Sequence, residues 1–143
     1  MTRLDPKRVL ERYARARGRR MTWEAHWQDC YEFALPQREG ALRQGGGGEK
    51  KSERLFDGTA PDAVDQLAAS LMAQLTPPWS SWFAFVPGPE ADADLRHLMA
   101  ADLERMTRVL QANFDRSNFV VEMHQCYLDL VTAGTACLMF EEA

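Results

Sequence analysis

The apolar positions of this chain fall mainly at helical spacing, in stretches separated by glycine and proline. The clearest stretch lies between residues 60 and 75, where apolar side chains recur every three or four positions. Thr59 can cap a helix there together with Asp62 three residues on, and Pro77 and Pro78 forbid its continuation. The pattern therefore predicts a helix with a defined start and a defined end.

Two further helices are predicted before residue 37. Asp5 and Pro6 form an N-cap and first-turn pair, and an arginine-rich helix is expected to follow and to end at Gly18. Thr22 can cap a second helix with an aromatic face, which Pro36 stops. Two separate helices are thus expected in this region.

The second half of the chain predicts two more helices and two strands. One helix opens at Asp92 or Asp94, and another is capped by Ser117. Residues 81–86 are rich in aromatic side chains and residues 135–140 are almost continuously apolar, which is typical of short strands. The expected fold class is therefore α+β, mainly α, with about five amphipathic helices and one or two short strands.

The segmentation of the chain follows from these patterns. A lone strand at 135–140 needs a partner, so we expect a truncated chain; the alternative is that it pairs with residues 81–86 and completes the domain. A single domain is expected, with these segments: 1–20 a basic N-terminal helix, 21–36 an aromatic helix, 37–53 a flexible glycine-rich loop, and 54–143 a helical segment with short strands.

Charge is distributed unevenly along the chain. The net charge is −4, yet residues 1–20 carry eight Lys/Arg against two acids, and residues 57–143 carry four against thirteen. The basic helix could meet phosphates, or it could pack on the acidic remainder of its own fold or on a neighbouring subunit. Aromatic residues around the Pro-Pro turn are either structural anchors or a stacking and binding patch. The candidate subunit-interface or DNA-facing residues are Arg8, Arg12, Arg15, Arg19, Trp79 and Trp82.

The sequence supplies no recognisable catalytic chemistry. The run Gly45–Ser52 differs from a phosphate-binding loop because Lys50 stands where that loop needs glycine. Cys30, Cys126 and Cys137 are too widely spaced for a zinc site or a disulfide framework. No apolar run reaches the ~20 residues that span a bilayer. We therefore expect no enzyme activity, no cofactor, no bound metal and no membrane partner.

An ordered series of short motifs resembles the N-terminal part of the head-to-tail connecting (portal) proteins of short-tailed, podovirus-type bacteriophages. The resemblance runs over roughly residues 10–143. Its motifs, in chain order, are Trp23 and Trp27, Tyr31 to Pro36 with Arg38, a polar glycine loop, Arg54 to Ala60, Ala63 to Leu75, Thr76-Pro77-Pro78, Trp82-Phe83, Asn113-Phe114, Ser117-Asn118-Phe119, Leu130, Gly134-Thr135-Ala136 and Glu141-Glu142.

The resemblance implies a structural role in a virion or prophage. Such subunits form a homo-oligomeric ring, a dodecamer, at one capsid vertex, assembled in the cytoplasm of the host bacterium. Through the ring double-stranded DNA is packaged and ejected, and the implied partners are the capsid protein, the terminase motor, the tail proteins and the passing DNA. This chain would correspond to the outer wing. The alternative is a small stand-alone nucleic-acid-binding module that uses the basic N-terminal helix.

Overall fold

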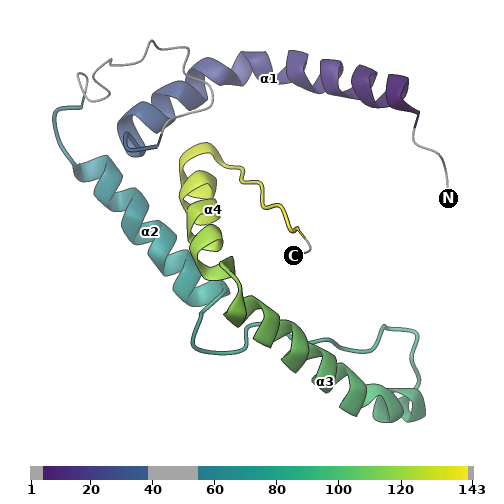
Figure 1. Ribbon diagram of the computed structural model, residues 1–143. Coiled ribbons are helices and arrows are strands. Elements are labelled where there is room, and N and C mark those ends of the chain that lie inside the picture. Colours follow the sequence, from purple (N-terminus) through teal and green to yellow (C-terminus); the bar gives the residue numbers. More distant parts are fainter. Residues whose placement is uncertain (1–4, 39–54, 142–143) are drawn as a thin grey trace. The chain divides into compact units, whose positions relative to one another are not determined.

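The computed structural model describes residues 5–38 and 55–141 and is helical over 70% of them (Figure 1). The chain divides into two compact units, Met1–Val64 and Asp65–Ala143, and each is described by itself. The loop expected at residues 37–53 lies almost wholly outside the described residues. Residues 5–38 and 55–141 form four helices, which are α1 (Pro6–Ala34), α2 (Thr59–Leu75), α3 (Ala93–Arg116) and α4 (Phe119–Ala133).

The expected α+β class is wrong, because the described residues contain no strand or sheet and the fold is all-α. Residues 81–86 and 135–140 are extended but unpaired. The backbone N–H of Phe85 donates instead to the hydroxyl of Thr107 in α3, over 3.0 Å. Aromatic content that predicts a strand here reflects the packing of rings on helices, since β-propensity largely measures side-chain packing.

The two helices expected before residue 37 are a single helix, α1, so the break predicted at Gly18 is also wrong. A glycine inside a helix costs only about 1 kcal/mol relative to alanine, which flanking turns can offset. The hydroxyl of Thr22 donates to the Arg19 carbonyl, 3.0 Å away, instead of capping a new helix. Arg20 and Glu24 then pair across the next turn at 3.0 Å.

The start of α1 follows the sequence prediction. The Asp5 carboxylate accepts a hydrogen bond from the N–H of Lys7, at 3.0 Å, and Pro6 occupies the first turn. An N-cap carboxylate satisfies one of the donors that a helix start leaves unpaired. The helix ends at Ala34, two residues before Pro36, as the proline requires.

The start of α2 differs in detail from the expected capping by Thr59. Thr59 is itself the first helical residue, and its backbone N–H donates to the Asp57 carboxylate at 2.9 Å. Hydrogen bonds from the backbone and then the side chain of Thr59 lower the pKa of Asp57 below its usual value. The helix itself, and its end at Leu75 before Pro77, are confirmed.

In the second unit, α3 and α4 follow one another through a two-residue turn. Asp92 caps α3, accepting from the N–H of Leu95 at 2.8 Å. At the turn the Ser117 hydroxyl donates to the Phe114 carbonyl, at 2.9 Å, and accepts from the N–H of Phe119, at 3.1 Å. Helix α4 ends at Gly134, whose φ of 73° lies in the left-handed region that glycine adopts without strain.

A buried hydroxyl pair connects the end of α2 to α4. The Oγ1 of Thr76 and the phenolic oxygen of Tyr127 are 3.1 Å apart, and the two residues are only 8% and 3% exposed. A buried hydroxyl without a partner costs about 1–3 kcal/mol, so each group depends on the other. This contact spans 51 positions of sequence and fixes where the α2 terminus meets α4.

The first test concerns the continuity of α1. Gly18→Ala should stabilise the helix by about 1 kcal/mol, because alanine loses less backbone entropy and its Cβ meets nothing within 4 Å. Circular dichroism should show a higher helical content, and the Cα chemical shifts of residues 17–22 should be helical in both proteins. Ala16→Gly is the matched control in the opposite direction. Non-helical shifts over this stretch would show that α1 is two helices.

The second test is a double-mutant cycle on the buried hydroxyl pair. Thr76→Val and Tyr127→Phe should each lower the free energy of unfolding by about 1–2 kcal/mol, because each leaves the other hydroxyl unpaired. The double variant should lose less than the sum, giving a coupling of about 1 kcal/mol in urea titrations. Strictly additive losses would mean that the two hydroxyls do not interact.

Candidate functional site

Six aromatic side chains form one cluster in the second unit. They come from the extended segment after α2, the end of α3, the start of α4 and the segment after α4. The aromatic cluster comprises Trp82, Phe83, Phe85, Phe114, Phe119 and Phe140.

Phe114 lies at the centre of the aromatic cluster. Its ring centroid is 4.4 Å from that of Phe119 and 5.9 Å from that of Trp82, both in stacked geometry. Phe83 meets Phe114 edge-on at 5.9 Å, and Phe140 lies 6.5 Å away. Each such ring pair contributes about 0.5–1.5 kcal/mol beyond the area that it buries. The cluster thus joins four segments of chain.

The two predicted tryptophan sites have different surroundings. Trp82 is half-buried and also stacks on Phe119, with centroids 5.9 Å apart and planes 5° apart. Trp79 is 73% exposed and belongs to no described ring pair. Trp82 is therefore a member of the aromatic cluster, whereas Trp79 lies on the surface at the turn after α2.

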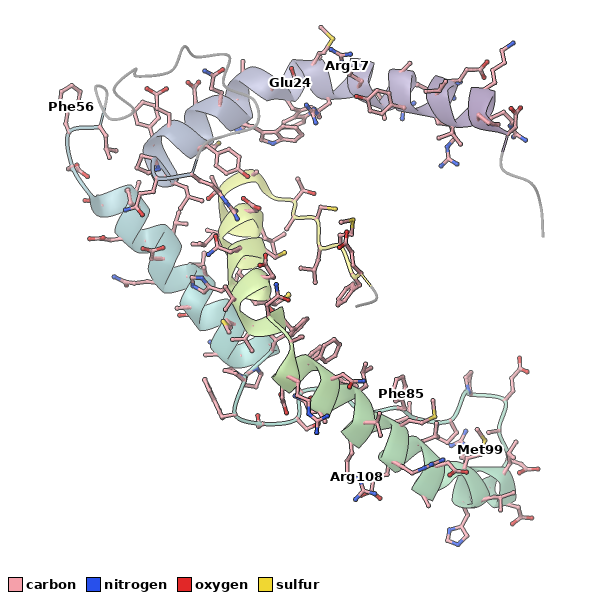
Figure 2. All side chains as sticks on the ribbon, in the orientation of Figure 1. Arg17, Glu24, Phe56, Phe85, Met99 and Arg108 are labelled. Atoms are coloured by element: carbon pink, nitrogen blue, oxygen red, sulfur yellow. The ribbon has the colours of Figure 1, made fainter. Side chains whose placement is uncertain are left out.

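Thr107 connects the aromatic cluster to α3 through a polar contact that the sequence pattern did not predict. The hydroxyl accepts from the Phe85 N–H, at 3.0 Å, and donates to the Leu103 carbonyl, at 2.9 Å. Figure 2 shows the labelled Phe85 side chain beside the ribbon of α3. Thr107 is only 9% exposed. A threonine between Leu103 and Leu110 on an apolar helix face was the available signal, because a buried hydroxyl needs a partner.

The four predicted arginine sites share one side of α1. Positions three and four apart are neighbours on a helix, so Arg8, Arg12, Arg15 and Arg19 follow one another along it. We call these four residues the basic row. All four are exposed, and their guanidinium groups have no hydrogen-bond or ion-pair partner among the described residues.

An apolar strip runs beside the basic row on α1. Val9, Leu10 and Tyr13 are 48%, 66% and 63% exposed, and we call them the α1 strip. No residue of α1 is buried in the structure as described. Unpaired cations beside uncovered apolar side chains are typical of a surface that receives a partner.

Groups that could support metal or redox chemistry are sparse in the described residues. Residues 5–38 and 55–141 contain no group of three or more His, Cys, Asp or Glu side chains placed to hold a metal ion. The Cys30 sulfur lies 3.7 Å from the His26 ring nitrogen one turn away, and Cys126 contacts the Cys137 carbonyl at 3.9 Å. In the same described stretches, no helix is both long and apolar enough to cross a membrane.

The described ring contacts of the second unit therefore anchor its segments on one another. Comparison with known proteins then identifies the family. The sequence profile of the family described as "Bacteriophage head to tail connecting protein" matches residues 6–143. The chain belongs to this head-to-tail connecting family. The resemblance inferred from the sequence motifs is thereby confirmed.

Two relatives of this family member carry portal names. The chain is 32% identical over 135 residues to the "Probable portal protein" of Bordetella phage BPP-1, covering 92% of this chain and 24% of the relative. It is 24% identical over 143 residues to the "Portal protein" of Salmonella phage epsilon15, covering 99% of this chain and 26% of the relative. The chain thus spans about a quarter of the length of the two curated relatives it matches. No solved structure matches it.

The third test concerns the hydrogen bond between Thr107 and Phe85. Thr107→Val keeps the side-chain shape but leaves the Phe85 N–H without its acceptor, so the free energy of unfolding should fall by about 1–2 kcal/mol. Urea denaturation of the 143-residue chain measures this loss. Thr107→Ser, which retains the hydroxyl, should lose less.

A matched control is available in α4. The buried Oγ1 of Thr132 has no hydrogen-bond partner in the described structure, so Thr132→Val should be neutral within about 0.5 kcal/mol or stabilising. Equal losses in the Thr107 and Thr132 variants would show that the contact with Phe85 contributes nothing.

Proposed function

We propose that this head-to-tail connecting chain forms the wing portion of a portal subunit, in a homo-oligomeric ring at one vertex of a phage capsid. Double-stranded DNA passes through that ring during packaging and ejection, and the tail attaches to it. The observation that carries the proposal is the family match over residues 6–143, together with two portal-named relatives aligned over nearly the whole chain. The role is structural, and we assign no catalytic residue.

The exposure of apolar side chains supports an assembly role on physical grounds. In the described residues, the buried apolar side chains are those of Val64, Ala68, Tyr127 and Leu128. Large hydrophobic side chains at 36–94% exposure are far more numerous and occur on all four helices. Exposed apolar side chains in such excess over buried ones are typical of chains that bury them against other chains.

The proposed ring implies contacts with the capsid protein, the terminase motor and the tail proteins. DNA would be a passing cargo rather than a ligand recognised by sequence. The particle would be assembled in the bacterial cytoplasm, and the chain would then remain at the capsid vertex of the virion. The basic row and the aromatic cluster are the described features that we expect at such contacts.

The fourth test locates the chain in particles. Antibodies raised against the 143-residue chain, used for immunogold electron microscopy on virions or induced prophage particles from the source strain, should label one vertex per capsid. Preimmune serum and virions of an unrelated phage provide the controls. Labelling distributed over the whole shell, or particles that lack the chain while still containing DNA, would contradict a portal function.

A further inference from the structure

A second exposed apolar strip lies on α3, and it is accompanied by charges of the opposite sign to those beside the α1 strip. Its side chains recur every three, four or seven positions, so they share one side of the helix. The α3 strip consists of Leu95, Leu98, Met99, Met106 and Val109, which are 44%, 76%, 37%, 52% and 58% exposed.

Acidic side chains accompany the α3 strip. Asp102 lies within it and Asp94 flanks its first turn, and both are exposed. Between residues 90 and 109, which include the whole strip, there are five acids against the three cations Arg96, Arg105 and Arg108. Arg96 is turned back on its own loop, with its Nε donating to the Ala91 carbonyl at 2.7 Å. The surface therefore presents an excess of two acids beside apolar side chains.

The first half of α1, which carries the α1 strip, has an excess of positive charge. Between residues 6 and 20 there are seven Lys/Arg side chains against the single acid Glu11. The basic row follows one edge of the α1 strip along about three helical turns. Both surfaces are single helix faces with an apolar strip, and they differ in the sign of their charge. Such complementarity suits docking of one upon the other.

We propose that the basic row and α1 strip of one copy dock on the α3 strip and its acids in a second copy of this chain. This rests on the proposed ring function and names the surfaces that join neighbouring subunits. A ring is built from heterologous contacts, in which each subunit supplies two different, complementary surfaces. The two helix faces meet that requirement, since a basic face and an acidic face are present on the same chain.

The two exposed ion pairs near the α3 strip do not oppose docking. Asp102 and Arg105 are 3.3 Å apart with side chains that are 75% and 72% exposed. Glu104 and Arg108 are 3.7 Å apart, and both side chains are 70% exposed. An exposed pair of this kind contributes little, so Asp102 can exchange Arg105 for an arginine of the basic row at small cost. The apolar strips then lose their contact with water together with the charges that flank them.

Paired charge reversals on the 143-residue chain test this docking. The first variant is Arg12→Glu with Arg15→Glu, and the second is Asp94→Lys with Asp102→Lys. Sedimentation velocity at about 0.05 M salt should show self-association of the unaltered chain, which weakens at about 0.5 M salt. Each variant alone should associate at least about ten-fold more weakly, because like charges then face each other.

Mixing the two variants is the decisive measurement. An alternating assembly of the two restores opposite charge at every contact, so the mixture should associate to within about three-fold of the unaltered chain. If α1 instead packs on α3 of its own chain, the mixture stays weak and only a chain carrying all four reversals recovers. That result would overturn the proposal.

A matched control reverses acids elsewhere. Asp62→Lys with Asp65→Lys also combines one acid in the first turn of a helix with a second acid further along, and it should leave self-association unchanged. Circular dichroism checks that each variant is folded. If a reversal variant unfolds, Arg12→Gln with Arg15→Gln and Asp94→Asn with Asp102→Asn replace it, and each should still weaken association.

Two other outcomes also decide the matter. If the unaltered chain does not self-associate, the docking proposal fails, while vertex labelling of particles still supports the portal function. If reversal of Arg12 and Arg15 leaves association intact but abolishes salt-sensitive binding to a random-sequence DNA duplex, the basic row is a DNA surface and the proposal is overturned. If the charge-reversal results support docking but immunogold labelling finds no chain at a capsid vertex, the portal function is contradicted and the docking proposal stands.

Discussion

The ring of Phe114 touches four other aromatic rings, and the arrangement of the second unit depends on that meeting point. Two of its neighbours, Trp82 and Phe83, come from the extended segment after α2. Phe119 opens α4, and Phe140 lies in the segment after α4. In a unit with few fully buried apolar side chains, stacked rings hold segments that would otherwise have no regular pairing.

Buried hydrogen bonds add to the ring contacts in holding the second unit together. The extended segment has no neighbouring strand among the described residues, so its backbone donors need other acceptors. Thr107 supplies one for Phe85, and the hydroxyl pair of Thr76 and Tyr127 ties the end of α2 to α4. These contacts are few but buried, and the loss of one partner leaves a desolvated group unpaired. The fold thus combines local helices with a small number of long-range ties.

The surface of the molecule bears on its assembly. Both α1 and α3 carry apolar strips that the described residues leave exposed, with arginines along one and carboxylates along the other. Burial of the strips against another chain would remove this apolar surface from water. The chain belongs to a family of head-to-tail connecting proteins, and exposed apolar strips are compatible with membership of such a family.

Local physics predicted the helices but did not predict all their limits. The cap at Asp5 and the stop at Gly134 could be predicted from the sequence, because capping chemistry is local. The start of α3 was narrowed to Asp92 or Asp94, and the structure selects Asp92. The break at Gly18 was wrong because glycine only lowers helix stability by about 1 kcal/mol, and neighbouring turns decide the outcome. Asp57 was missed as the acceptor at the start of α2.

The site could be predicted in part for the same reason. Helical spacing alone places Arg8, Arg12, Arg15 and Arg19 on one side of α1, and the ordered motifs indicated the family. Trp82 could not be distinguished from Trp79, since their difference in exposure depends on Phe114 and Phe119, more than thirty positions away.

The sequence by itself determined which stretches are helical, the separation of charge and the family of this protein, because each depends on residues close together or in fixed order. It did not determine that residues 6–34 form a single helix. Only the tertiary structure decided that residues 81–86 and 135–140 form no sheet. An extended aromatic segment can pair with a strand or pack on helices. Its sequence is compatible with both, and the choice depends on whether Thr107 and Phe114 lie within reach.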